Sequence, residues 1–171
     1  MPGFESSYDD VFADLLKVAA PWRPKTKPET PEWRQWFEEN LAPDIAKRPD
    51  LQELRAKIMS FGGSEVLIRD MDNPPNEVKR LLTRGQFWRG SAARMRKGMN
   101  NRCHGNSACL MQEGHGEVVN GYALSQDGLW RPHSWVLTPE GGLLETTVQR
   151  KAYFGAVLTR REVDDEIDIY A

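Results

Sequence analysis

The spacing of apolar residues changes near Glu113, and this change constrains the fold more than any other feature of the 171-residue sequence. Before it, apolar residues recur at helical spacing in segments that begin or end at prolines and glycines. After it, β-favouring runs alternate with turn sequences such as Gln126-Asp127-Gly128 and Pro139-Glu140-Gly141-Gly142. Helices followed by consecutive antiparallel strands are typical of an α+β fold. We therefore expect a helical N-terminal half, then a cysteine-bearing helix packed on an antiparallel β-meander.

Four helices are predicted before the cysteine-bearing one. The first covers residues 6–19, and the second begins at Thr30-Pro31, because proline at the first helical position loses no needed hydrogen bond. A third begins at Pro49 and stops at Gly62-Gly63. The fourth is capped by Asn73-Pro74-Pro75. The strands are predicted at residues 66–68, 118–124, 133–137, 143–148 and 153–159.

A chain of this length is expected to form a single domain. We divide it into a helical N-terminal extension at residues 1–62, an α+β core at 63–160 and an acidic tail at 161–171. The longest apolar runs are far short of the ~20 residues of a membrane helix, and the first residues have no signal-peptide pattern. The sequence therefore predicts a cytoplasmic protein with no membrane contact.

Charge is almost balanced over the whole chain but unevenly distributed. The formal net charge is −2, which excludes the strongly basic character typical of a non-specific nucleic-acid binder. The stretch from Lys79 to Arg102 is nevertheless rich in lysine and arginine. Such a run is most often a solvated face, and it is also a candidate contact for an anionic partner. A nucleic-acid-associated protein that uses this stretch stays open as a third hypothesis.

The two cysteines, Cys103 and Cys109, have different predicted roles. On a helix they lie about 240° apart, so they do not pair with each other, and we expect free thiols in a reducing compartment. Cys109, beside Leu110, is predicted to be a core thiol. Cys103 is predicted to begin a helix, where partial positive charge and unpaired N–H groups favour the thiolate. Cys103 is thus the candidate nucleophile.

His133 and Glu145 are the predicted partners of this thiol. Each lies in a β-favouring run, and neighbouring antiparallel strands place a histidine and a carboxylate side by side on one face. The carboxylate would hold the imidazole in one tautomer and stabilise its cation. The other ring nitrogen would then face Cys103, which is the arrangement of nucleophilic acyl transfer.

The order of these residues resembles a known family. The matching pieces are Cys103-x-x-x-x-Ala108, Val119-x-Gly121-Tyr122, His133-Ser134-Trp135 and Glu145-x-Thr147. Over roughly residues 98–150 they are similar to the transglutaminase-like branch of the papain-like cysteine enzymes, which has a cysteine opening a helix and then Val-x-Gly-Tyr, His-Ala-Trp and Asp-x-Thr strands. Glu145 stands where that family usually has aspartate, and Ser134 where it has alanine. The short spacing of cysteine and histidine is typical of a minimal, divergent member.

The resemblance implies a thioester formed on Cys103, with no metal and no organic cofactor. An oxyanion hole would use the backbone N–H of this residue and one side-chain donor, for which Asn101, Gln86 and Trp88 are the candidates. Trp135 is predicted to pack beside the histidine and screen it from water. His104 is more often a surface or helix-capping residue, and it is a candidate substrate contact.

Two classes of function follow. The leading hypothesis is a cysteine hydrolase or acyltransferase that acts on an amide-type bond in a peptide, a protein or a small amide. The alternative is a non-catalytic binding or inhibitor protein built on the same fold, such as a phage or host-defence factor. A zinc site made from Cys103, His104, Cys109 and His115 is not predicted, because these residues lack a recognised ligand spacing.

Overall fold

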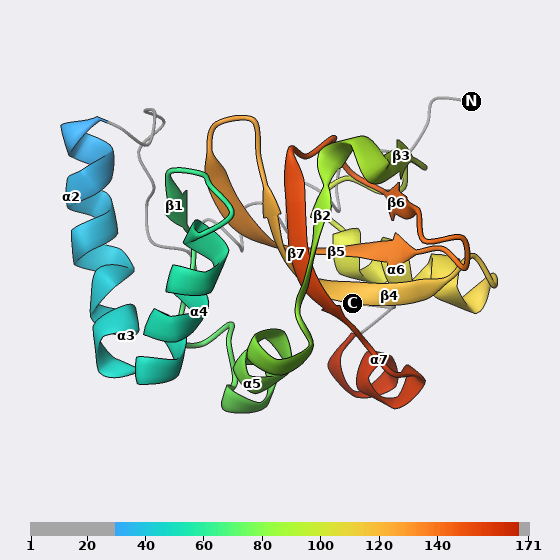
Figure 1. Ribbon diagram of the computed structural model, residues 1–171, viewed down its shortest axis with the longest axis horizontal. Coiled ribbons are helices and arrows are strands. Elements are labelled where there is room, and N and C mark those ends of the chain that lie inside the picture. Colours follow the sequence, from blue (N-terminus) through green and yellow to red (C-terminus); the bar gives the residue numbers. More distant parts are fainter. Residues whose placement is uncertain (1–29, 168–171) are drawn as a thin grey trace, which may run out of the picture.

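The computed structural model describes residues 30–167, which form a mixed sheet and the helices that cover it (Figure 1). The sheet has seven strands in the order β2-β7-β4-β5-β6-β3, with β1 added on β5. The predicted α+β class is confirmed. The helix predicted at residues 6–19 and the tail residues 168–171 lie outside the described residues.

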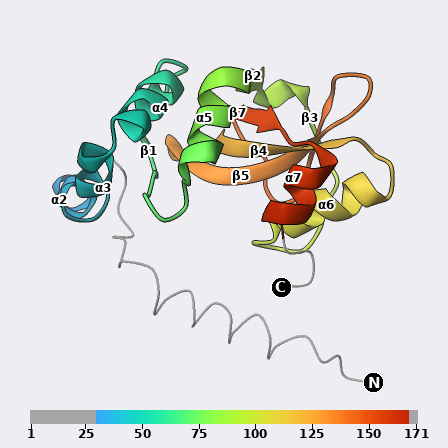
Figure 2. The ribbon, with the colours of Figure 1, turned by 90° about the horizontal axis from the view of Figure 1, so that it is seen from below.

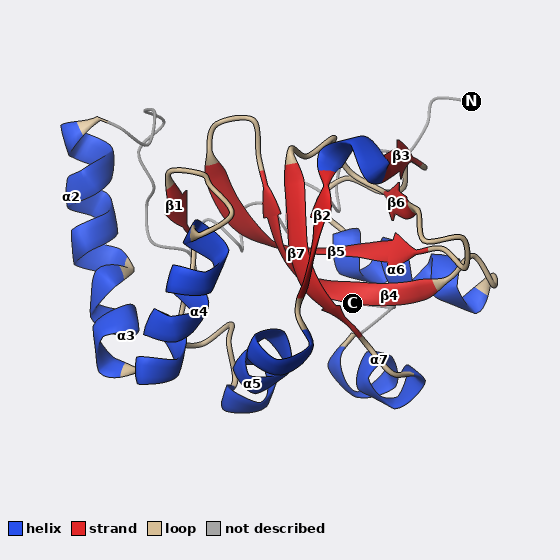
Figure 3. Cartoon of the chain, viewed as in Figure 1, coloured by secondary structure: helices blue, strands red, loops and turns tan. Residues whose placement is uncertain are grey.

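The elements are distinguished by colour in Figure 3. The strands are β1 (Glu65–Val66), β2 (Gln86–Arg89), β3 (Ala93–Met95), β4 (Glu117–Leu124), β5 (Leu129–Leu137), β6 (Leu143–Glu145) and β7 (Ala152–Val157). The helices are α2 (Pro31–Asn40), α3 (Ala42–Lys47), α4 (Pro49–Met59), α5 (Pro75–Arg84), the short 3-10 helix η1 (Gly90–Ala92), α6 (Cys103–Gln112) and α7 (Arg160–Glu166). Within residues 30–167, every helix is too short or too polar to cross a membrane.

The helices predicted to begin at Pro31 and Pro49 are confirmed as α2 and α4. Together with α3 they gather at one end of the sheet, as two perpendicular views show (Figures 1 and 2). The core beneath them contains the buried aromatic side chains of Trp33, Trp36 and Phe37. Burying large rings and aliphatic side chains is the main stabilising contribution at this end of the molecule.

The simple antiparallel meander is wrong in part. Strands β4, β5 and β6 pair antiparallel in chain order, but β7 returns to pair with β4. Strands β1 and β3 are short and pair in parallel with β5 and β6. The close approach of β7 to β4 requires Gly121, because a Cβ there would lie 2.2 Å from the carbonyl oxygen of Phe154. The two strands within the basic stretch, β2 and β3, are too short to show a periodic pattern in the sequence.

The two faces of the sheet have different partners. Side chains alternate along β4, so Val118 and Tyr122 point to one face and Val119 to the other. Helices α5, α6 and α7 pack on the face of Val118 and Tyr122, together with the N-terminal helices. The opposite face holds a separate cluster that includes Trp135 and Tyr153. His133 lies two residues before Trp135 on β5 and therefore belongs to this second face.

Helix α6 packs on β4 and β5 through Ala108 and Leu110. Cys109, between them, is exposed, so the prediction that it is a core thiol is wrong. The reason is the helical turn of about 100° per residue, which directs Cys109 away from the sheet while both of its neighbours face it. Adjacency to an apolar residue in the sequence is therefore no indication of burial on a helix.

Part of the predicted acidic tail is ordered as helix α7. Thr159 caps this helix in a capping box with Glu162. Arg80 of α5 is mostly buried and forms ion pairs with Glu162 at 3.2 Å and with Glu166. Val163 is fully buried against the sheet. Residues 160–166 are thus part of the packed structure and are not a solvated end.

Candidate active site

Cys103 is the first residue of α6, as the sequence predicts. Within residues 30–167 the helix has no side-chain cap, so its first turn is not closed by a capping hydrogen bond. Asn101, two residues before Cys103, has a φ of 56°, in the left-handed region that asparagine tolerates better than most residues. This turn directs the chain into the helix and leaves the thiol half-buried.

The loop before Cys103 is held by Asn106, one turn into the helix. The Asn106 carboxamide accepts a hydrogen bond from the Met99 N–H at 3.1 Å and donates one to the Met99 carbonyl at 2.8 Å. The Gly98 N–H donates to the Thr146 carbonyl at 2.8 Å, directly after β6. These contacts fix the start of α6 relative to the strand that carries Glu145.

His133 and Glu145 lie side by side, on β5 and at the end of β6. Nε2 of His133 is 3.0 Å from Oε1 and 2.8 Å from Oε2 of Glu145, and both side chains are buried. The sequence predicted this pair from the neighbouring antiparallel strands. Since the carboxylate occupies Nε2, the other ring nitrogen, Nδ1, is the one available to a third group.

Glu145 is held by neutral donors as well as by the histidine. Its Oε1 accepts the backbone N–H of Thr147 at 2.9 Å and the Thr147 hydroxyl at 3.0 Å. Its Oε2 accepts the Tyr153 hydroxyl at 2.9 Å. Burial alone would favour the protonated acid, but the hydrogen bond and charge of His133, with these donors, keep the pKa of Glu145 below its ordinary value. The histidine therefore faces a buried carboxylate, not a neutral acid.

His104 and His133 both act on the Cys103 side chain, with which they line one cavity. Burial disfavours the thiolate, but the hydrogen bonds and charges of the two imidazoles outweigh it and lower the pKa of Cys103 to about 5. Burial likewise disfavours the imidazolium of His133, but Cys103 and Glu145 raise the pKa of His133 above its ordinary value. These shifts all favour a thiolate–imidazolium pair backed by a carboxylate.

His104 contacts a residue of β5 that points to the face opposite His133. Its Nδ1 lies 2.5 Å from Oγ of Ser134. The Ser134 hydroxyl donates to Oδ1 of Asn120 at 3.1 Å, so it accepts the hydrogen bond from His104. Two consecutive residues of the helix, Cys103 and His104, therefore contact two consecutive residues of the strand, His133 and Ser134. Strand β6 pairs with β5 at Val136 and Leu137. The edge of β5 at His133 and Ser134 is therefore left open to the start of α6.

Aromatic rings enclose the histidine, as predicted for Trp135. The ring of Trp135 is fully buried and stacks at 6.1 Å from that of His133, and Tyr153 stacks at 6.4 Å. Trp88 packs edge-on against Trp135 at 5.9 Å. These rings lower the local polarity around the His133–Glu145 pair and keep water from it.

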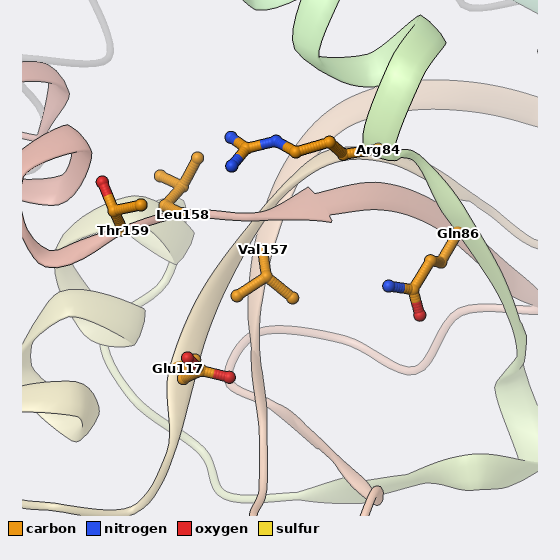
Figure 4. A pocket seen from close by; sticks show the side chains of 6 residues that line it. All are labelled: Arg84, Gln86, Glu117, Val157, Leu158 and Thr159. Carbon is orange, nitrogen blue, oxygen red and sulfur yellow. The ribbon is translucent and has the colours of Figure 1, made fainter.

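A cavity of about 680 Å³ lies beside the thiol. Cys103, His104 and His133 line it together with Asn101, so this candidate oxyanion donor lies at the site. Gln86 does not. It lines a different pocket with Arg84 and Thr159 (Figure 4), and Trp88 lies behind Trp135 instead of at the cavity.

The remaining candidates are placed as follows. Among residues 30–167 no three His, Cys, Asp or Glu side chains are arranged to hold a metal ion. His115 is directed to Glu113, with Nε2 3.2 Å from its carboxylate. Within the basic stretch, Arg80 and Arg84 form ion pairs with acidic residues of α7 and Arg96 with Glu113, so this stretch is not one continuous unpaired surface.

Comparisons with protein-family models, with curated proteins and with solved structures found no match. The resemblance to transglutaminase-like enzymes therefore stays a prediction from the motif order. The chemistry of the site follows from the arrangement of Cys103, His133 and Glu145.

The sequence motif Glu145-x-Thr147 contains Thr147, which lies two positions after Glu145 and thus on the same side of an extended chain. Other supporting contacts have no such sequence signal. Tyr153 had none, since it reaches the carboxylate only through the return of β7 to β4. The pairing of His104 with Ser134 depends on where the helix meets the strand, which no local pattern specifies.

Proposed function

We propose that the protein is a cysteine-dependent hydrolase or acyltransferase that cleaves an amide-type bond through a thioester intermediate. The observation that carries this proposal is the placement of His133 between two groups. Glu145 occupies Nε2 through both carboxylate oxygens, and the Cys103 thiol lies in the cavity that the same ring lines. A structural thiol has no need of a buried, charge-stabilised imidazole beside it.

The steps of such a reaction follow from these three side chains. The Cys103 thiolate attacks the carbonyl carbon, forming a C–S bond and moving the C=O electron pair onto oxygen. When the C–N bond breaks, the His133 imidazolium gives its proton to the departing amine nitrogen. Water or an acceptor amine then loses a proton to the neutral imidazole and attacks the thioester, and the sulfur leaves as thiolate. Glu145 holds the ring and stabilises its cationic form throughout.

The tetrahedral intermediate needs donors for its oxyanion. The backbone N–H of Cys103 at the uncapped start of α6 supplies one, in the positive field of the helix terminus. Asn101 is the side chain among the sequence candidates that lines the cavity. The buried rings of Trp135 and Tyr153 lie against His133 and strengthen its ion pair with Glu145.

Acylation of the thiol tests the proposal directly. With 4-nitrophenyl acetate we expect a burst of one nitrophenolate per chain at pH 7, and an acetyl group on the peptide containing Cys103 by mass spectrometry. Cys103→Ala abolishes the burst, whereas Cys109→Ser, the matched change at the exposed thiol, keeps it. No burst from folded wild-type protein, or equal labelling of both thiols, contradicts the proposal.

The alternative, a binding or inhibitor protein on the same fold, makes the opposite prediction. In that case Cys103→Ala combined with His133→Ala leaves partner binding intact, and the wild-type protein shows no acyl intermediate. No contact in the described part of the chain favours this alternative over the enzyme.

A further inference from the structure

The cavity beside Cys103 has a strongly one-sided charge. Three cationic side chains line it: Lys97, Arg131 and Arg150. Among the described residues, no aspartate or glutamate belongs to its lining. A concave site lined by a single sign of charge concentrates the field and selects ligands of the opposite sign.

The three cations are not equivalent. Arg131 already holds a carboxylate, with Asp127 Oδ1 and Oδ2 at 2.8 and 2.7 Å from its guanidinium. Within the described part of the chain, Lys97 hydrogen-bonds only a backbone oxygen, the Thr147 carbonyl at 2.9 Å, which leaves two further ammonium donors. Arg150 donates to the Ser125 hydroxyl at 2.6 Å. In the stretch 30–167 no carboxylate lies within ion-pair distance of Lys97 or Arg150.

Arg150 also has an unused donor. Its Nε is buried and has no hydrogen-bond partner among residues 30–167. Buried N–H groups of native proteins are almost always paired, and an unpaired one costs about 1–3 kcal/mol. Because Nε is buried, it does not itself reach a ligand in the cavity; the remaining guanidinium donors, on a side chain that lines the cavity without a carboxylate partner among the described residues, are suited to a negatively charged ligand.

We propose that the cavity takes an acyl substrate that carries a negatively charged group, a carboxylate or a phosphate, bound by Lys97 and Arg150 while the carbonyl carbon lies against Cys103. The inference rests on the proposed function and adds the substrate class. The two cations lie on segments that flank the catalytic residues: Lys97 precedes the turn into α6, and Arg150 follows the end of β6. Lys97 bonds the carbonyl of Thr147, the residue whose N–H and hydroxyl hold Glu145, and Arg150 is held by Ser125.

Two nearly isosteric alkylating reagents test this without an acyl substrate. Iodoacetate is anionic and iodoacetamide is neutral, and both react with the same thiolate. We expect the iodoacetate-to-iodoacetamide rate ratio to be at least about tenfold higher at Cys103 than at Cys109, as measured by peptide mass spectrometry. Lys97→Gln and Arg150→Gln each lower that ratio about fivefold, which corresponds to one charge in a partly desolvated site.

Lys151→Gln is the matched control, because Lys151 is exposed, next to Arg150 in the chain and outside the cavity lining. It leaves the ratio unchanged. Lys97 is also exposed, so its substitution is not expected to affect folding, and it keeps the test informative if Arg150→Gln unfolds the chain. A ratio unaffected by Lys97→Gln in folded protein overturns the proposal.

Protection experiments distinguish the two anions. Glutarate and inorganic phosphate are added at equal ionic strength during alkylation by iodoacetamide, with sodium chloride as the reference. Protection by glutarate alone identifies a carboxylate site, and protection by phosphate alone a phosphate site. In either case Lys97→Gln removes the protection. Equal effects of glutarate, phosphate and chloride reflect general screening and count against the site.

Failure of the inference and failure of the proposed function give different results. The ratio of the two reagents is independent of how nucleophilic Cys103 is, because both need the same thiolate. A high, Lys97-dependent ratio without an acetyl burst leaves the anion site standing and removes the acyl-transfer function. A normal acetyl burst with a reagent ratio at Cys103 like that at Cys109 leaves the acyl-transfer function standing and removes the anion site.

Discussion

Nδ1 of His104 lies 2.5 Å from the hydroxyl oxygen of Ser134, one position beyond the contact between Cys103 and His133 on both the helix and the strand. The thiol is thus placed between two imidazoles, each fixed by a different group on β5 or β6. Because both imidazoles stabilise the thiolate, the pKa of Cys103 falls to about 5 although the side chain is half-buried.

The pH dependence of alkylation is the first prediction. A thiol with a pKa of about 5 is almost fully ionised at pH 6, so the iodoacetamide rate at Cys103 reaches half its plateau near pH 5 and is flat from pH 6 to 8. The rate of N-acetylcysteine rises about tenfold per pH unit over that range. At pH 5.5 we expect Cys103 to react about tenfold faster than N-acetylcysteine, since the lower intrinsic nucleophilicity of its thiolate offsets part of the gain in thiolate fraction. A profile parallel to that of N-acetylcysteine contradicts the thiolate.

Glu145→Gln is expected to weaken the pair. The neutral amide no longer stabilises the His133 imidazolium, so the alkylation midpoint of Cys103 moves up by about one pH unit or more. The acyl burst slows about tenfold or more, and the free energy of unfolding falls by about 1–3 kcal/mol, because donors from Thr147 and Tyr153 lose a carboxylate. Glu140→Gln, in an exposed turn, is the control. A Glu145→Gln protein with the wild-type midpoint would show that the carboxylate has no electrostatic role.

Ser134→Ala tests the second imidazole. It removes the hydroxyl that accepts the hydrogen bond from His104, so the ring is no longer fixed beside the thiol. We expect the alkylation midpoint of Cys103 to rise, by less than in Glu145→Gln, and the free energy of unfolding to fall by about 1 kcal/mol. Ser91→Ala at an exposed position serves as the matched substitution. If only stability changes and the midpoint stays near pH 5, His104 does not contribute to the thiolate.

Glu77 gives a pH-dependent stability away from the thiol. Burial, followed by the charge and hydrogen bond of Glu166, raises the pKa of Glu77 to about 7, and Arg80 and His104 only partly oppose this. A carboxyl whose pKa is higher in the folded state stabilises the protein fully below its unfolded pKa near 4.5 and loses that contribution as pH rises through about 7. Glu77→Gln therefore flattens the stability profile between pH 5 and 8, by about 1 kcal/mol after solvent screening.

The measurement is the urea midpoint across this pH range. Glu53→Gln, on the exposed side of α4, is the control and keeps the wild-type profile. The idea fails if Glu77→Gln and the wild-type protein lose stability equally between pH 5 and 8.

Local signals were the reliable part of the prediction. The starts of α2 and α4 follow from proline positions in the chain, because helix initiation depends on a few neighbouring residues. The pairing of His133 with Glu145 follows from strands that are adjacent in sequence. Cys109 was assigned to the wrong side of its helix, since that choice depends on which face meets the sheet.

The sequence by itself determined the α+β class, the helix that begins at Cys103, and the order of cysteine, histidine and acid, because each depends on short-range patterns. Only the tertiary structure decided that β7 returns to β4 and brings Tyr153 to Glu145, that His104 joins the thiol, and that Lys97 and Arg150 share its cavity. Those relationships depend on contacts between residues far apart in the chain. Their energies come from packing and burial, which no local pattern of residues encodes.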